Sequence, residues 1–388
     1  MVPTSAKSDS AAESASASAF NPAILAVNPG STSTKLAMYH GLKEAGVFEI
    51  EWKLRAGLRG AAVAAEVEKY VAEIEKFLQS HKQKPDAVVG RGGFIHCAHR
   101  PLKSGVYWVA KIKNSHVEVC EDIYRGVTEA PDLDHASNYG IPVAARIATH
   151  FKIPAFTVDP VVVDDLQDVA RFSGYAPIQR RSLAHVLSVR AIGRKAAAEL
   201  GKDFFHTKMV AVHLGGGITV AALRDGRIVD VNNALLGGGP FSPQRVGSLP
   251  MRELIDLCYS GRFTKQELYS ELTKRGGLVS YLGDDNCLNI EKRIESGDKQ
   301  AELVMRAMAY QIAKSIGGMA IAAGGRVDAI VFSGGLSRSE WLMGHIRSQI
   351  EHLAPVVVYP GSLEMEAMAH GAYRVLAGQE EAMTYSLS

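Results

Sequence analysis

Cysteine and aromatic residues are scarce in this chain. Its 388 residues include four cysteines, Cys97, Cys120, Cys258 and Cys287, and aromatic side chains make up 7% of the total. The cysteines lie far apart and form no Cys-x-x-Cys pair, which argues against a disulfide framework and against a zinc knuckle. This use of cysteine favours a reducing, cytoplasmic location.

The chain also lacks an excess of charge of either sign and lacks long apolar runs. Forty-three Lys and Arg side chains face 41 Asp and Glu, a net charge of +2. Such a balance argues against binding nucleic acid or a membrane surface through a bulk electrostatic field. No apolar run approaches the 18 or so residues that a membrane-spanning helix needs. We therefore expect small-molecule partners, with neither nucleic acid nor a membrane among them.

The composition is that of an ordinary globular protein, with 47% apolar and 22% charged residues. At roughly 150 residues per domain, the length predicts two domains. Residues 1–22 are the exception, because the first 19 of them hold twelve Ser or Ala residues and only three charged ones. We predict a disordered tail there, since this segment has neither the apolar region of a signal peptide nor the Arg-rich face of a transit peptide.

The two halves of the chain contain related segments. Aligned without gaps, residues 24–41 match residues 209–226 at six of 18 positions. Each copy reads as a strand, a Gly-containing turn, a second strand and a hairpin leading to a third strand. Two further pairs follow in the same order: 86–93 with 328–335, and 154–160 with 355–360. The repetition predicts two α/β lobes, each a sheet with helices on its faces, that meet at a cleft.

Three Gly-rich or hydroxyl-rich loops have the character of phosphate sites. The first runs from Asn28 to Lys35 and offers backbone N–H groups, hydroxyls and one cation. The second, His213 to Gly217, stands at the equivalent place in the other half, and its glycines permit a close approach of the backbone to a ligand. Ser333, Gly334 and Gly335 form the third. The chain contains no G-x-x-x-x-G-K-[ST] motif, which disfavours Walker-type NTPases, and the alternative for each loop is a plain turn.

Two arginines and several acid-base residues are further candidates. Arg91 and Arg245 lie in stiff, Gly-flanked or Pro-flanked loops, where a guanidinium can grip carboxylate or phosphate oxygens. Asp159 ends a strand, where α/β sheets place their ligands, although a helix N-cap is the alternative. His135 and His185 could equally be structural histidines.

Eight motifs together resemble the acetokinase family, and within it the butyrate kinase branch. They occur in order over residues 23–378: NPGSTSTK (28–35), VGRGG (89–93), HASN (135–138), VDPVVVD (158–164), HLGGG (213–217), DVNN (230–233), GPFSPQR (239–245) and FSGG (332–335). The resemblance implies the duplicated actin-like, Hsp70-like ATPase fold, with two ribonuclease H-like lobes around a central cleft. It also implies ATP-dependent, Mg2+-assisted phosphorylation of a short-chain fatty acid to its acyl phosphate, and a homo-oligomer.

The resemblance also implies lobe boundaries and roles for individual residues. The N-terminal lobe would span 23–162, the nucleotide-binding lobe 163–365, and residues 366–388 would return to the first lobe. The implied roles are nucleotide binding by Asn28, Ser31, Ser33, Lys35, His213, Gly215, Gly216, Gly217, Ser333, Gly334 and Gly335; catalysis by Arg91, Asp159, His185 and Arg245; substrate binding by Arg91, His135 and Asp159; and metal binding by Asn28 and Glu364.

The chain departs from the family pattern at two places. Glu364 falls where the family has a magnesium-associated Glu-Glu pair, but Met365 replaces the second carboxylate, and Leu363 replaces an asparagine. Glu366 either substitutes for the missing carboxylate or faces solvent. Gly90 occupies a position where acetate kinases carry histidine, which favours butyrate over acetate.

The implied reaction needs no general base, because a fatty acid is already ionised at neutral pH. We expect catalysis by in-line positioning and by positive charge from Mg2+, Arg91, Arg245, Lys35 and a protonated His185. Three readings stay open at this stage. The substrate is butanoate or another short acid, such as a branched-chain acid, propionate or acetate; or the protein is a sugar kinase with Asp159 as its base; or it is a non-enzymatic, actin-like nucleotide switch.

Overall fold

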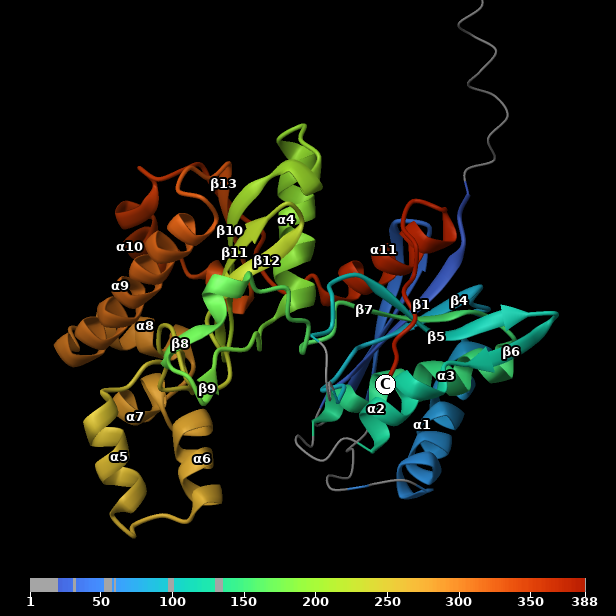
Figure 1. Cartoon of the computed structure of the whole chain (residues 1–388), viewed down its shortest axis with the longest axis horizontal. Helices are drawn as coiled ribbons and strands as arrows, with labels where there is room; N and C mark the ends of the chain where they lie inside the picture. The colour runs from blue at the N-terminus through green and yellow to red at the C-terminus, as the bar shows by residue number, and fades with distance from the viewer. Residues whose placement is uncertain are drawn as a thin grey trace, which may run out of the picture.

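The chain folds into two α/β lobes that stand side by side (Figure 1). The computed structural model describes residues 20–30, 33–51, 58, 61–96, 101–129 and 135–387. Most of the expected N-terminal tail and the candidate residue Ser31 lie outside these ranges. No helix within them is both long enough and apolar enough to span a membrane.

The first sheet has the strand order β3-β2-β1-β4-β7-β5-β6 in the described part of the chain. Its strands are β1 (Ala23–Pro29), β2 (Ser33–His40), β3 (Lys43–Glu51), β4 (Ala87–Gly90), β5 (Val106–Lys113), β6 (His116–Val119) and β7 (Ala155–Val158). Strands β1, β4 and β7 run parallel, whereas β2, β3, β5 and β6 are antiparallel to their neighbours. The carboxyl ends of the three parallel strands therefore share one edge of the sheet.

Both faces of this sheet are covered by helices. Leu25 and Val27 of β1 share a core with α1 (Ala61–Ser80), α2 (Glu121–Thr128) and α3 (Gly140–Phe151). Ile24 and Ala26 point to the opposite face and pack with α11 (Glu364–Leu376). Because successive strand residues point to opposite faces, an uninterrupted apolar strand such as β1 requires apolar partners on both sides.

The second sheet has the order β12-β11-β10-β13-β14 among the described residues. These strands are β10 (Lys208–Leu214), β11 (Ile218–Arg224), β12 (Arg227–Val231), β13 (Ala329–Ser333) and β14 (Val356–Val358). One face packs against α9 (Lys299–Ala322) and α10 (Glu340–Ile350), and the other packs against α4 (Val186–Glu199). Helices α4 and α11 contact each other where the two lobes face one another (Figure 1).

Smaller elements complete the fold. The hairpin of β8 (Phe172–Tyr175) and β9 (Ile178–Gln179) precedes α4. Between β12 and α9 the chain forms α5 (Met251–Tyr259), α6 (Lys265–Lys274), α7 (Gly277–Leu282) and α8 (Cys287–Glu295). Short 3-10 helices lie at η1 (Ala136–Tyr139), η2 (Asp168–Arg171), η3 (Phe204–His206) and η4 (Gly335–Arg338).

The predicted duplication is confirmed, with one correction of register. Strands β2-β1-β4-β7 correspond to β11-β10-β13-β14, with the same parallel and antiparallel pairings. However, Pro29 pairs with Thr34 in the first hairpin, whereas Leu214 pairs with Ile218 in the second. The second turn is one residue shorter. The gapless alignment is therefore correct along β1 and β10 but shifted by one residue along β2 and β11.

Gly334, in the second lobe, has a backbone conformation that residues with a side chain rarely adopt. Gly334 has φ +97°, and a Cβ there would lie 2.1 Å from the carbonyl oxygen of Leu214. The neighbouring Gly335 begins η4 with an ordinary backbone, and a Cβ there would meet nothing within 4 Å. The two neighbouring glycines therefore differ in whether they leave room for a Cβ, and Gly335 can serve as the control for Gly334.

We expect Gly334→Ala to lower the free energy of unfolding by about 2 kcal/mol or more, because it adds backbone strain and a backbone clash. Gly335→Ala should change it by less than about 1 kcal/mol. Urea denaturation followed by circular dichroism measures both. Equal midpoints for the two variants would contradict this description of the β13–η4 turn.

Candidate functional site

Candidate residues from three parts of the chain meet at the carboxyl edge of the first sheet. Asn28 lies near the end of β1, Arg91 follows β4, and Glu364 begins α11. Arg91 Nη1 lies 2.6 Å from Glu364 Oε2, and Asn28 Nδ2 donates a hydrogen bond to the same oxygen at 3.0 Å. The Arg91 and Glu364 side chains are 12% and 20% exposed. The structure thus joins two residues expected in metal binding with one expected to contact substrate.

The loop that carries Arg91 is held by close contacts between backbones. A Cβ on Gly90 would lie 2.0 Å from the carbonyl oxygen of Gly140, and a Cβ on Gly140 would lie 2.2 Å from that of Arg91. In addition, the backbone N–H of Phe94 donates to Asn138 Oδ1 at 2.8 Å. The glycines therefore allow the β4 loop to lie against η1 and α3, which fixes the position from which Arg91 extends.

Glu364 is ionised in this setting. Its burial by itself would raise the pKa of the carboxyl group, but Arg91, His213 and the hydrogen bond from Asn28 outweigh burial and hold the pKa below its usual value. The carboxylate is thus available to an incoming cation. No group of three or more His, Cys, Asp or Glu side chains suited to a metal occurs within the described residues.

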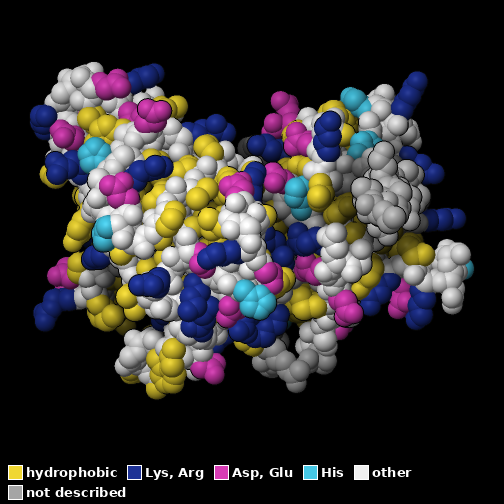
Figure 2. All heavy atoms as spheres, turned by 90° about the horizontal axis from the view of Figure 1, so that it is seen from above, with side chains coloured by type: hydrophobic (Ala, Val, Ile, Leu, Met, Phe, Trp, Pro, Cys, Tyr) yellow, Lys and Arg dark blue, Asp and Glu magenta, His cyan; other side chains and the backbone are white. Residues whose placement is uncertain are grey.

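The first predicted phosphate loop opens onto a cavity of about 450 Å3. Asn28, Gly30, Ser33 and Lys35 line it together with Glu364. Lys35 stands opposite Asn28 in the β1–β2 ladder, and its side chain is exposed. The Gly30 N–H donates to the Ser33 carbonyl oxygen at 2.8 Å, which closes the turn. Figure 2 shows the hollow between the lobes from above, with charged side chains of both signs around it.

The second predicted phosphate loop brings Arg245 into the site. A Cβ on Gly217 would lie 2.0 Å from Arg245 Nη1, so only glycine leaves room for this guanidinium. Arg245 donates a hydrogen bond to the carbonyl oxygen of Ala234, and Ser242 Oγ accepts one from the Arg245 N–H at 3.1 Å. Ser242 Oγ also donates to the Gly216 carbonyl oxygen at 2.6 Å. The glycine loop and the arginine loop therefore form one unit.

His213 connects the second loop with the third. It is 9% exposed, and its Nδ1 lies 3.3 Å from Ser333 Oγ. Gly334, beside Ser333, exchanges backbone hydrogen bonds with Gly361 at 2.8 and 3.1 Å. The third Gly turn is thereby anchored close to the start of α11, which carries Glu364.

His185 and His213 form a stacked, uncharged pair. Their ring centroids lie 4.3 Å apart, and His185 Nδ1 lies 2.8 Å from Thr219 Oγ1. Burial, with His213, Arg245 and Arg91, holds the pKa of His185 well below its usual value, and burial lowers the pKa of His213 to about 4. The expectation of a protonated His185 is therefore wrong, because burial and neighbouring positive charge both oppose a second proton.

His135 belongs to the same electrostatic environment. Its pKa is lowered by burial and then by Arg91 and Arg245. Its Nδ1 accepts a hydrogen bond from the Ser137 N–H at 3.2 Å, and its ring meets that of Phe94 edge-on at 5.6 Å. Arg91 and Arg245, from opposite lobes, are thus both close enough to His135 and His185 to oppose protonation of either histidine.

Asp159 is the candidate whose surroundings differ most from the expectation. Its side chain is 5% exposed and forms an ion pair with Arg190 of α4, and it accepts a hydrogen bond from the Gly105 N–H at 2.7 Å. Its φ of +43° is unusual for a non-Gly residue. The structure thus attaches Asp159 to α4 rather than to Arg91 or Glu364.

Sequence reasoning did not identify three supporting residues. The hydroxyl of Thr219 contacts both the backbone N–H and the ring of His185. Arg190 forms an ion pair with Asp159, and Asn138 holds the loop that carries Arg91. Each acts over 31 to 44 residues of chain separation. Only the family-like motif HASN, which contains Asn138, marked any of them.

The chain is similar in sequence to known proteins over most of its length. The acetokinase family matches residues 175–356. A protein of Listeria monocytogenes serotype 4b (strain CLIP80459) named "Probable butyrate kinase" is 42% identical over 365 residues, which cover 93% of this chain and 99% of that protein. A protein of Coprothermobacter proteolyticus with the same name is 41% identical over 370 residues, with the same coverage.

Solved structures agree on the fold. The acetate kinase of Porphyromonas gingivalis superposes with a TM-score of 0.68 at 20% identity, covering 92% of this chain and all of that one. The propionate kinase of Francisella tularensis gives a TM-score of 0.66 at 18% identity, covering 90% and 98%. These likenesses confirm the predicted duplicated, two-lobed α/β fold. Together with the identity to the two relatives over nearly their whole length, they show that the chain belongs to the acetokinase family of carboxyl-group phosphotransferases.

Proposed function

We propose that this protein transfers the γ-phosphoryl group of ATP to a short-chain fatty acid, with butanoate as the preferred acceptor. The observation that carries the proposal is that Arg91 and Arg245, from opposite lobes, both act electrostatically on His135 and His185, while Arg91 also pairs with Glu364 beside Asn28. Two anions must approach each other in this reaction, and the fixed positive charge offsets their repulsion.

The transfer needs no proton acceptor. A carboxylate oxygen of the acid attacks the γ-phosphorus as the bond from phosphorus to the β,γ-bridging oxygen breaks, and ADP leaves with the electron pair. The acyl phosphate forms directly, and the same steps in reverse regenerate ATP. Arg91 would bind the acid's carboxylate, while Arg245 would bind the oxygens of the group in transfer. Neutral His135, His185 and His213 would donate hydrogen bonds from ring N–H groups.

The three glycine-bearing loops would bind the nucleotide. Asn28, Ser33 and Lys35 line the cavity of the first lobe, and we assign Ser31 to the same loop. Across the cleft, His213 and Gly215 to Gly217 would face the phosphates, whereas Ser333, Gly334 and Gly335 would lie nearer the ribose and base. Backbone N–H groups in such loops suit phosphate oxygens.

The residues present also fit a magnesium ion. Mg2+ commonly takes one or two protein carboxylates together with substrate phosphates, which agrees with a single ionised Glu364 beside Asn28. When bound, such an ion would supply positive charge to the phosphate oxygens. Glu364 and Asn28 would hold it, and Arg91, which pairs with Glu364, would bind the acid.

We assign Asp159 a positioning role. Its buried pair with Arg190 fixes α4, and the first residue before α4 is His185. This pairing disfavours the sugar kinase alternative, because that reaction requires a free carboxylate as general base and Asp159 is held by a guanidinium. An actin-like switch without enzymatic activity is disfavoured by membership of a family of phosphotransferases.

The preference for butanoate is supported by the two relatives named "Probable butyrate kinase" and by Gly90. A histidine at position 90, as expected in acetate kinases, would place its Cβ 2.0 Å from the Gly140 carbonyl oxygen. The backbone around Gly90 therefore leaves no room for a histidine side chain. Branched-chain acids, propionate and acetate remain the alternative acceptors.

We also propose that the protein is a cytoplasmic homo-oligomer. Large apolar side chains are exposed on and beside the β8–β9 hairpin: Val169, Phe172, Tyr175 and Ile178 are each more than 60% exposed. An apolar group of this kind is typical of a surface that another chain covers. Among the described cysteines, Cys120, Cys258 and Cys287 are free, which fits a reducing compartment.

The direct test is a hydroxamate assay for acyl phosphate with ATP, Mg2+ and straight-chain acids of two to six carbons. We expect a product with these acids and the highest kcat/KM with butanoate. No acyl hydroxamate from any acid would refute the carboxylate kinase proposal. Faster turnover of acetate would refute only the chain-length preference, and faster turnover of a sugar would favour the alternative kinase.

We expect Arg245→Ala to reduce kcat on the order of 10³-fold, because the variant removes positive charge from the transferring phosphoryl group. Arg227→Ala, at an exposed position of β12, is the matched control and should stay within about twofold of the unchanged protein. Steady-state kinetics with butanoate measure both variants. An unchanged rate in Arg245→Ala would remove this arginine from the transfer step.

The two glutamates of the first turn of α11 can be separated experimentally. Glu364→Gln keeps a hydrogen-bonding oxygen but loses the charge, so we expect the Mg2+ concentration for half-maximal rate to rise at least tenfold. Glu366 borders the same cavity as Glu364 but lies 4.0 Å from Lys195 of α4, so we expect Glu366→Gln to leave that concentration unchanged. A large effect in Glu366→Gln alone would show that this residue replaces the missing family carboxylate.

A further inference from the structure

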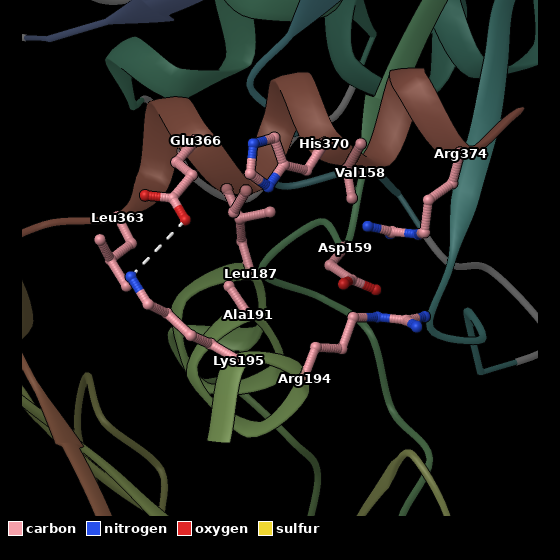
Figure 3. Close-up of a pocket in the computed structure, with 11 residues that line it drawn as sticks. Val158, Asp159, Leu187, Ala191, Arg194, Lys195, Leu363, Glu366, His370 and Arg374 are labelled. Carbon is pink, nitrogen blue, oxygen red and sulfur yellow. Dashed lines mark ion pairs between the residues drawn. The ribbon is translucent and has the colours of Figure 1, made fainter. Parts of the chain in front are cut away.

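A second cavity lies between α4 and α11 (Figure 3), beside the cavity of the first phosphate loop, with which it shares Leu363 and Glu366. Its volume is about 280 Å3. Leu187, Ala191, Arg194 and Lys195 face it from α4, and they recur at the spacing of a single helix face. Arg194 is nine residues beyond His185, which corresponds to about 13 Å along the helix axis. Leu187, which also lines the cavity, is only two residues beyond His185, so the Arg194 end of the cavity alone lies more than two helical turns from the stacked histidines.

The wall of this cavity is apolar in the middle and charged at both ends. Val158, Leu187, Ala191 and Ala367 provide aliphatic surface. Figure 3 shows Arg194 and Arg374 directed toward the Asp159 end, whereas Lys195 and Glu366 lie at the other end. The space therefore suits a molecule that is partly aliphatic and partly ionic.

The charges around the cavity do not balance. Asp159 pairs with Arg190, and Glu366 lies 4.0 Å from Lys195. Glu380 Oε2 accepts a hydrogen bond from Arg374 Nε at 2.7 Å and lies 3.6 Å from Arg194 Nη2. Four cationic side chains thus face three carboxylates: Arg190, Arg194, Lys195 and Arg374 against Asp159, Glu366 and Glu380. The carboxylate nearest to Arg194, that of Glu380, is already hydrogen-bonded to Arg374.

Arg194 is the side chain left with hydrogen-bonding capacity. Its side chain is 22% exposed, and its guanidinium stacks on Phe204 and Phe205 at 4.6 and 5.1 Å from the ring centroids. Within the described residues, none accepts a hydrogen bond from its guanidinium. Burial, followed by the like charges of Arg374 and Arg190, lowers the pKa of Arg194 to about 10. A bound anion would supply the missing acceptor and relieve this repulsion.

We propose that the α4–α11 cavity is a second carboxylate site, which binds a short aliphatic monocarboxylate with its carboxylate on Arg194 and its chain along Leu187, Ala191 and Ala367. Inorganic phosphate would satisfy the arginine but would leave this aliphatic wall without a partner. The apolar wall therefore favours the aliphatic carboxylate over inorganic phosphate.

Isothermal titration calorimetry with hexanoate, butanoate and inorganic phosphate tests the proposal. We expect two sites for hexanoate on the unchanged protein, and one each on Arg194→Gln and on Arg91→Ala. Affinity at the Arg194-dependent site should rise roughly fourfold for each added methylene. Arg262→Gln is the matched control, because Arg262 also stacks on a phenylalanine but is exposed and lines no part of this cavity.

A second variant keeps the charge and fills the space. Ala191→Leu should abolish the Arg194-dependent site and leave kcat for acyl phosphate formation within about twofold. Loss of that site in both Arg194→Gln and Ala191→Leu, but not in Arg262→Gln, supports the proposal. Two hexanoate sites remaining in Arg194→Gln, or tighter binding of phosphate than of hexanoate at that site, would overturn it. Failure to form any acyl phosphate would instead refute the proposed function without affecting this result.

Discussion

The site depends on two arginines that supply positive charge in a buried setting, where the neighbouring histidines are uncharged. Arg91 and Arg245 come from opposite lobes, and each lowers the pKa of both His135 and His185. Burial alone would make these histidines neutral, and the arginines reinforce this effect. The site therefore holds a fixed positive charge that does not vary near neutral pH. Glu364, in contrast, is a carboxylate that Arg91 keeps ionised. This arrangement suits the approach of two anions, because neither partner has to gain or lose a proton.

The positions of these charges follow from the duplicated architecture. Three parallel strands of the first sheet end at one edge, and the loops after β1 and β4 deliver Asn28 and Arg91 to it. In the second lobe the equivalent turn has three glycines, and Gly217 makes room for Arg245. The same hairpin thus serves a different purpose in each half: a cavity lined by polar side chains in one, and the accommodation of an arginine in the other. The one-residue difference in turn length accompanies this divergence.

The sequence was sufficient to predict two related α/β lobes and several residues that the structure brings together, such as Asn28, Arg91 and Glu364. Strongly apolar strands ending at glycines occur twice in the same order, and this signal is local enough to read along the chain. The register along β11 could not be predicted, because six identities do not reveal that a turn is one residue shorter. The charge state of His185 and the attachment of Asp159 to Arg190 were also out of reach. Both depend on burial and on contacts between residues more than 25 positions apart, and composition carries no record of these.

We propose that the phosphoryl group passes directly between oxygens held by opposite lobes, without a phosphorylated enzyme side chain. The stereochemistry at phosphorus tests this most directly, using ATP with a chiral γ-thiophosphoryl group and butanoate as the acceptor. A single in-line displacement predicts inversion of configuration in the acyl thiophosphate. Retention would mean two successive displacements through a covalent intermediate, and it would rule out direct transfer.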